Sequence, residues 1–162
     1  MTERPILFST PLVGAILNGT KTVTRRLTRR GADGERRIYA EEGDVLWVRE
    51  SWREGHDGYV YRAGRAISDS PHAGPWKPSI HMPRAACRLY LRVLSVDLEP
   101  LQAITEDDAL REGVRGDLVA YGTDSAREAF RILWDKINGE RCAWAENPLV
   151  WRVEFERMEG RP

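Results

Sequence analysis

An amine and two hydroxyls lie within four residues near the start of the chain. Lys21, Thr22 and Thr24 follow shortly after Gly19, and a glycine lets the backbone come close to a ligand. A threonine hydroxyl becomes a nucleophile when a base takes its proton, and a lysine desolvated in a pocket can be that base. The segment could therefore cleave an acyl group. It could equally be the start of an ordinary strand with a solvated lysine.

Glu112 is a candidate partner because of its place on a predicted helix. Residues 104 to 109 are typical of a helix N-terminus with Asp108 in the position that reaches back to the cap, and the helix should run to Gly113. Glu112 then lies at the C-terminal end, where the helix dipole opposes a negative charge. A buried carboxylate there could donate or accept a proton, whereas an exposed one would be ordinary surface.

Other polar and aromatic residues could recognise a nucleobase. Glu50, Trp52 and Tyr61 would supply a carboxylate for an exocyclic amine and faces for stacking, although strand packing is an alternative explanation. His81 lies among prolines that would fix the shape of its loop. The predicted substrate-binding residues are therefore Arg26, Glu50, Trp52, Tyr61 and His81. The histidines lack convergent ligand spacing and no Gly-x-Ser-x-Gly is present, so we expect neither a metal site nor a serine triad.

The elements that must position these residues can be placed from local signals. A helix capped near position 10 should end at Gly19, and the β-forming residues that follow predict a strand. Strand alternation would put Lys21 and Arg25 on one face and Thr24 on the other. A bend or bulge is therefore needed for Lys21 and Thr24 to meet.

The rest of the pattern favours an α+β fold. Alternating apolar residues predict further strands, at residues 45 to 50, 58 to 62, 86 to 98 and 149 to 156. An apolar stripe from Ala126 to Ile137 predicts an amphipathic helix, interpreted as core and not as part of a site. Without a βαβ rhythm, the expectation is a small, mostly antiparallel β-barrel with flanking helices. We expect one domain, residues 1 to 162, with loop insertions at about 28 to 43 and 53 to 85.

Composition limits the classes of function that this protein can have. Of the 162 residues, 41% are apolar, which is enough for a packed core, and no run approaches the roughly 20 apolar residues that span a bilayer. We therefore predict a cytoplasmic protein with no membrane partner, whose cysteines, Cys87 and Cys142, are buried free thiols. The formal net charge of zero argues against coating long nucleic acid, but arginines cluster around Lys21, so a local anionic ligand stays possible.

Three segments together resemble the ASCH family. They are residues 16 to 26, with the pattern Gly-x-Lys-Thr-x-Thr-x-Arg, then Gly43 to Val48, then Ala109 to Gly113. The resemblance covers about two thirds of the chain and implies a PUA-like barrel. Residues 4 to 8, 47 to 52 and 76 to 84 also look like the longer, phage-associated branch of the family.

The resemblance implies an activity and its residues. Small bacterial ASCH proteins include amidohydrolases that remove the acetyl group of N4-acetylcytidine with a lysine, a threonine and a glutamate. By motif these are Lys21, Thr24 and Glu112 here. The expected partner is a small modified nucleoside or nucleobase, bound without a cofactor by a monomer or small homo-oligomer.

Two other functions stay open. Some ASCH members are linked to single-stranded RNA cleavage, and in that case Lys21, Arg26, Tyr61 and His81 would contact phosphates or stacked bases. A noncatalytic phage accessory role is the third possibility, because one fold hosts many functions.

Overall fold

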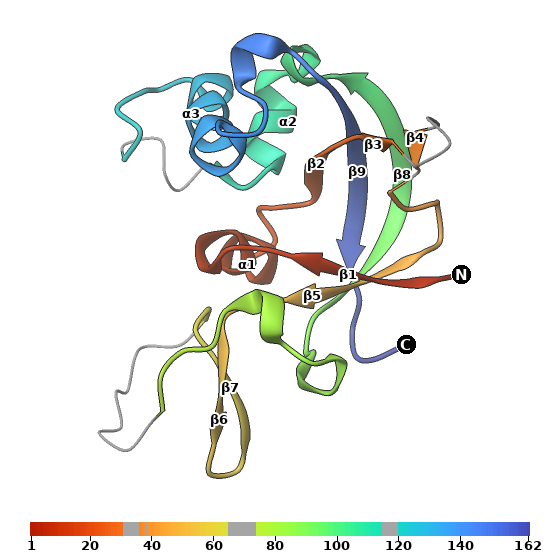
Figure 1. Ribbon diagram of the computed structural model, residues 1–162, viewed down its shortest axis with the longest axis vertical. Helices are drawn as coiled ribbons and strands as arrows, with labels where there is room; N and C mark the ends of the chain where they lie inside the picture. The colour runs from red at the N-terminus through yellow and green to blue at the C-terminus, as the bar shows by residue number, and fades with distance from the viewer. Residues whose placement is uncertain (31–35, 38, 65–73, 115–119) are drawn as a thin grey trace.

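A curved five-stranded sheet forms the centre of the protein (Figure 1). The computed structural model describes residues 1–30, 36–37, 39–64, 74–114 and 120–162. The strands lie in the order β1 (Glu3–Leu7), β5 (Val45–Arg49), β8 (Tyr90–Pro100), β9 (Leu149–Arg157) and β2 (Val23–Leu27). β1 is parallel to β5, and the other pairs are antiparallel. The predicted α+β, mostly antiparallel architecture is confirmed.

The sheet is open where a closed barrel was predicted. In the part of the chain that the structure describes, no ladder joins the two edge strands, β1 and β2. Side chains occupy the seam between them: Arg26 of β2 donates from Nη2 to the carbonyl of Leu7 at the end of β1, at 2.8 Å, and its guanidinium lies over the ring of Phe8. A side chain in this position keeps the two backbones too far apart to pair.

The first helix delivers the chain to β2. α1 (Thr10–Leu17) has Pro11 in its first turn and Asn18 as its C-cap. Gly19 follows with a φ of 81°, a left-handed conformation suited to glycine. Val13 and Ile16 of α1 pack on the apolar face of the sheet in the main core. The predicted helix is confirmed.

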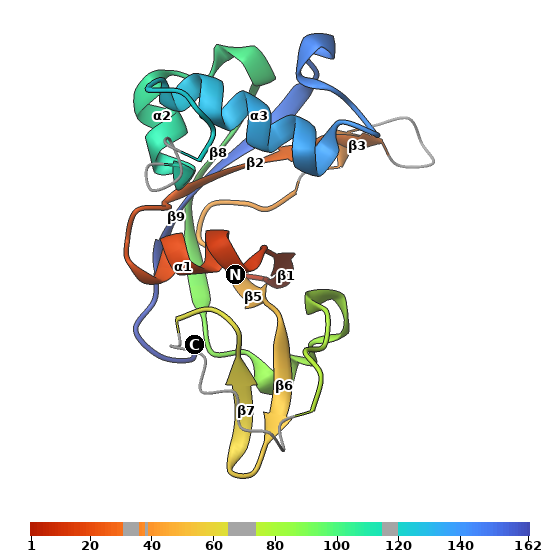
Figure 2. The ribbon, with the colours of Figure 1, turned by 90° about the vertical axis from the view of Figure 1, so that its left-hand side faces the viewer.

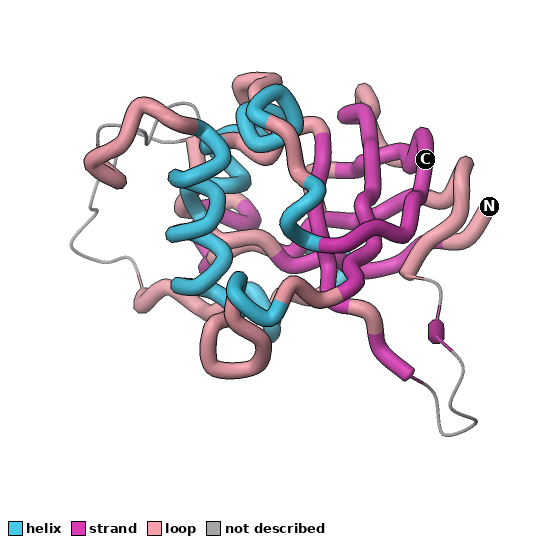
Figure 3. The backbone as a smooth tube through the Cα atoms, turned by 90° about the horizontal axis from the view of Figure 1, so that it is seen from above, coloured by secondary structure: helices cyan, strands magenta, loops and turns pink. Residues whose placement is uncertain are grey.

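Two further helices pack together at one end of the sheet. α2 (Glu106–Arg111) is capped by the Thr105 hydroxyl and α3 (Ala126–Asn138) by that of Ser125. Figure 3 shows the helices gathered to one side of the strands. Their second core cluster is completed by two 3-10 turns, η3 (Leu101–Ala103) and η5 (Trp144–Glu146). None of the described helices is long and apolar enough to cross a bilayer.

The predicted insertions contain short strands. β3 (Arg29–Arg30) pairs with β4 (Arg36–Arg37), where an irregular loop was predicted. β6 (Trp52–Gly55) and β7 (Gly58–Tyr61) form a hairpin that projects from the end of the molecule opposite α2 and α3 (Figure 2). Residues 31 to 35 and 65 to 73 of these insertions lie outside the described residues.

Two local predictions are wrong. The strand predicted from residue 86 begins only at Tyr90, because the segment after Pro83 forms a 3-10 turn, η2 (Arg84–Ala86), shortly after another, η1 (Ser79–His81). Both cysteines are free, but each is half-buried and not fully buried.

Candidate functional site

The amine of Lys21 lies buried in the interior, with 2% of the residue exposed. Its Nζ donates to three oxygens: the carbonyl of Val23 at 2.7 Å, the carbonyl of Glu112 at 2.9 Å and Oε2 of Glu112 at 2.8 Å. Three acceptors match the three N–H groups of an ammonium. Burial lowers the pKa of Lys21 from its ordinary value, although Glu112 opposes this shift. The proton is therefore held less tightly than on a surface lysine.

The backbone between α1 and β2 forces Lys21 inward. The amides of Thr20 and Lys21 both donate to the carbonyl of Ala15, and the amide of Thr22 donates to the carbonyl of Arg111 at 2.9 Å. These bonds attach the loop to the ends of α1 and α2, and β2 begins only at Val23. The loop supplies the bend that strand alternation required.

Gly113 allows α2 and this loop to approach closely. Its φ of 96° favours glycine, and a Cβ built there would lie 2.9 Å from Cβ of Ala15 and 3.1 Å from Cβ of Lys21. The glycine at the end of α2 thus sets the position of Glu112 relative to Lys21.

The Glu112 carboxylate is held by two cations. Oε2 accepts from Lys21, and Oε1 accepts from Nη1 of Arg25 at 3.1 Å. Only 3% of Glu112 is exposed, and it is the C-cap of α2, where the helix dipole disfavours its charge. The two cations offset this penalty and fix both oxygens.

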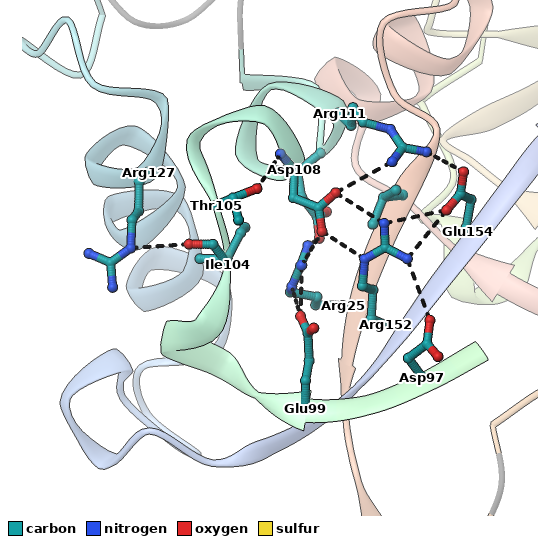
Figure 4. Close-up of polar contacts among 12 residues, drawn as sticks. Arg25, Asp97, Glu99, Ile104, Thr105, Asp108, Arg111, Arg127, Arg152 and Glu154 are labelled. Atoms are coloured by element: carbon teal, nitrogen blue, oxygen red, sulfur yellow. Dashed lines mark hydrogen bonds and ion pairs between the residues drawn. The ribbon is translucent and has the colours of Figure 1, made fainter. Parts of the chain in front are cut away.

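Arg25 is the residue that sequence reasoning missed. Its buried guanidinium contacts three carboxylates. One is that of Glu112, at 3.1 Å. The other two are those of Asp108 at 2.6 Å and Glu99 at 2.7 Å (Figure 4). Burial by itself lowers the pKa of Arg25, but Glu112, Asp108 and Glu99 together raise it. Strand alternation had already placed Arg25 on the face of Lys21, which was the available signal.

Asp108 does not reach back to cap its helix, contrary to the prediction. Its carboxylate turns towards the sheet and accepts from Arg152 (2.7 and 3.0 Å) as well as from Arg25 (Figure 4). These hydrogen bonds, that from Arg152 foremost, hold the pKa of Asp108 well below its usual range, and Asp108 in turn raises the pKa of Arg152. Two strand arginines outcompete one backbone amide for this carboxylate.

The three residues that the ASCH resemblance singled out meet at one cavity of about 180 Å³. Lys21, Thr24 and Glu112 line it, and the Thr24 hydroxyl has no hydrogen-bond partner within the described ranges. Leu133 and Ile137 of α3 form part of the apolar wall. The helix stripe predicted as core alone is therefore core at its start and cavity wall at its end.

Of the predicted substrate-binding residues, Arg26 alone lines this cavity. Glu50 is buried and accepts two hydrogen bonds from Arg88, at 2.8 and 2.9 Å. Trp52 is buried against Met82, and Tyr61 donates to a backbone carbonyl at 2.7 Å beneath the Arg88 guanidinium. His81 is exposed at the end of η1. The structure does not bring these four to Lys21, because β6, β7 and η1 lie at the other end of the sheet (Figure 2).

Comparison with known proteins gives information about the fold and none about the chemistry of the site. No protein-family model and no curated protein matches the sequence. The chain is similar in structure to EF3133 of Enterococcus faecalis, from the family DUF984, with a TM-score of 0.54 and 12% identity over 99% of this chain and 83% of that one. It is also similar to an ASCH domain of Lactobacillus crispatus, with a TM-score of 0.49 and 18% identity over 96% and 79%.

At these identities the likeness concerns the fold alone. With EF3133 it extends over nearly the whole chain. The protein therefore has an α+β domain of this kind, as the resemblance to the ASCH family predicts. Among the described side chains, no cluster of His, Cys, Asp and Glu is arranged to hold a metal ion.

Replacing Gly113 by alanine should destabilise the protein through contact with Lys21. Gly122 also has positive φ, but a Cβ there meets no atom of the described residues within 4 Å, so Gly122→Ala isolates the backbone strain. We expect Gly113→Ala to lose about 1–3 kcal/mol more than Gly122→Ala, the usual cost of overpacking. Urea unfolding of both variants measures the difference. Equal losses would show that the close approach is not a constraint.

Asp108→Asn should change how stability depends on pH. Because the folded-state pKa of Asp108 is lowered, the unfolded state binds more protons in acid. The contribution is complete above the unfolded pKa of about 4 and is lost as pH falls through the folded value. Asp108→Asn should flatten this acid loss and cost about 1–3 kcal/mol at pH 7, the usual cost of removing one partner from a charged hydrogen bond.

Asp97→Asn is the matched control, since Asp97 pairs with the same Arg152 but is 62% exposed. Chemical denaturation between pH 3 and pH 7 compares the two variants. If both have the same pH profile, Asp108 does not hold the network together.

Proposed function

We propose that this protein is an amidohydrolase that removes the acyl group from N4-acylated cytidine or cytosine. The observation that carries the proposal is the convergence of Lys21, Thr24 and Glu112 on one small cavity, with the Thr24 hydroxyl free of hydrogen bonds to the described residues. The substrate class comes from the resemblance of this residue set to ASCH amidohydrolases. An acylated exocyclic amine places its carbonyl carbon where a hydroxyl, an amine and a carboxylate can reach it.

Lys21 must first lose a proton, because its three acceptors hold it as an ammonium. The path is the 2.8 Å hydrogen bond to Oε2 of Glu112, and the lowered pKa of Lys21, caused by burial, reduces the cost of that transfer. The neutral amine then takes the proton of the Thr24 hydroxyl. Oγ1 of Thr24 attacks the carbonyl carbon of the amide.

Glu112 returns its proton to the substrate as the amide bond breaks. Collapse of the tetrahedral intermediate cleaves the C–N bond, the cytosine amine leaves with the proton from Glu112, and the acyl group stays on Thr24. Lys21 and Glu112 are then an ion pair again. The same relay activates a water, which hydrolyses the ester and returns the proton to Thr24.

We assign stabilisation of the oxyanion to a side chain. The backbone amides from Gly19 to Thr22 all donate to carbonyls within the fold, so they do not face the cavity as free donors. After Lys21 has taken the threonine proton, its ammonium can stabilise the negative charge on the attacked carbonyl oxygen. Arg25 is a positioning residue, since its guanidinium holds the carboxylate of Glu112.

Single-stranded RNA binding or cleavage is the second candidate. It is supported by Arg26 at the cavity and by arginines beside it. However, Tyr61 and His81, which that function would use, lie at the other end of the sheet. The amidohydrolase is the better supported of the two.

Lys21→Ala and Thr24→Ala should each lower kcat/KM for N4-acetylcytidine by about 100-fold or more, because each removes one member of the proton relay. Release of cytidine measures the rate, beside a labelled single-stranded RNA incubated with the same proteins. Thr22→Ala is the matched control, since the Thr22 hydroxyl accepts from Arg111 and Thr22 is not among the cavity residues.

Turnover by Lys21→Ala or Thr24→Ala at the wild-type rate would rule this scheme out. Cleavage of the RNA without release of cytidine would favour the second candidate. Circular dichroism spectra of the variants establish that each is folded.

A further inference from the structure

A second, larger cavity of about 600 Å³ adjoins the first along the open seam of the sheet. The two cavities share four lining residues: Leu7, Arg26, Leu27 and Asn138. The second is bordered on its other sides by Arg29, Arg141, Tyr39 and Trp151. A ligand whose reactive end lies beside Thr24 can therefore extend past Arg26 into this space.

The second cavity is positively charged. Three arginines line it, Arg26, Arg29 and Arg141, and none of its described lining residues is Asp or Glu. Two other arginines of this protein, the buried Arg25 and the half-buried Arg152, pair with carboxylates. Arg26, Arg29 and Arg141 form no ion pair with any acidic side chain that the structure describes. An anion would supply the missing partner.

Arg26 is the most informative of the three. Its Nη2 donates to the carbonyl of Leu7, but its Nε is fully buried and has no acceptor among the described residues. Its guanidinium centre lies 4.9 Å from the centre of the Phe8 ring, which holds the guanidinium in place. Buried cations are ordinarily paired, and a buried donor without an acceptor is unfavourable. Arg26 therefore lies between the two cavities, and its Nε–H group has no acceptor among the described residues.

The size of the first cavity limits what it can hold. Its volume of about 180 Å³ is below the roughly 300–1,000 Å³ of ordinary ligand sites. An acylated base fits this space better than a whole nucleotide does. The sugar and any group attached to it would then lie towards Arg26 and the second cavity.

We infer that the substrate carries a phosphate, so that the proposed amidohydrolase acts on an N4-acylated cytidine nucleotide whose phosphate is bound by Arg26, Arg29 and Arg141. Guanidinium groups bind phosphate oxygens through paired N–H donors. The C-terminal end of α3 at Asn138 disfavours an anion through its dipole, but a partial charge of about one half is outweighed by three full charges. This inference rests on the proposed function for the base and on the arginines for the phosphate.

Binding of the reaction product tests phosphate recognition by the arginines separately from the proposed catalytic activity. Isothermal titration calorimetry with cytidine 5′-monophosphate and with cytidine requires no catalysis. Wild-type protein should bind the nucleotide about tenfold or more tightly than the nucleoside, as expected when charged hydrogen bonds are added. Arg29→Ala/Arg141→Ala should remove most of that preference and leave cytidine binding unchanged. Raising the salt concentration should weaken binding of the nucleotide but not binding of cytidine.

The matched control removes two arginines that line neither cavity. Arg62→Ala/Arg92→Ala changes net charge by the same amount at exposed positions, and it should keep the preference for the nucleotide. In a parallel assay, kcat/KM for N4-acetylcytidine 5′-monophosphate should exceed that for N4-acetylcytidine, and the excess should require Arg29 and Arg141.

Several outcomes would overturn the inference. Equal affinities for cytidine and its monophosphate would do so, as would equal losses in the two double variants. Arginine-dependent binding of a ten-nucleotide RNA without binding of the mononucleotide would assign the cavity to an RNA strand instead. If the arginines bind the nucleotide but neither acylated compound is hydrolysed, phosphate binding is supported and the proposed function fails.

Discussion

The fold is organised around a buried ion pair between Lys21 and Glu112, with Arg25 as a third member. Removing two such charges from water costs several kcal/mol each, and their attraction repays this only with good geometry and full hydrogen bonding. Both oxygens of Glu112 and all three N–H groups of Lys21 are used. The loop before β2 must therefore meet the end of α2, and Gly113 must be small enough to allow it.

Burying this ion cluster costs free energy, and a role in function explains that cost better than a contribution to stability does. Well-packed apolar residues of similar volume often stabilise a protein as much as a buried ion pair, or more. Asp108, with Arg152, secures α2 to the sheet through contacts outside the cavity. Within the cavity, by contrast, burial weakens the hold of Lys21 on its proton, which a structural ion pair does not need.

The two cavities lie where the sheet is open, between its edge strands β1 and β2. A closed barrel would join β1 to β2 by backbone hydrogen bonds and leave no room between them. Here Arg26 lies across the seam and both cavities open along it. EF3133 of Enterococcus faecalis has a similar fold at 12% identity, so very different sequences form this architecture.

Local sequence signals determined the elements: the helix ending at Gly19, the strand after it, the helix capped by Thr105 and the stripe of α3. They follow from capping, glycine conformation and periodicity, which act over a few residues. Motif resemblance also selected Lys21, Thr24 and Glu112 as a set. Pairing over long separations was decided only by the tertiary structure. Lys21 and Glu112 are 91 residues apart, Arg88 neutralises Glu50, and Asp108 leaves its cap for two strand arginines. No local pattern specifies which charged groups share an interior, because that depends on how strands and helices pack.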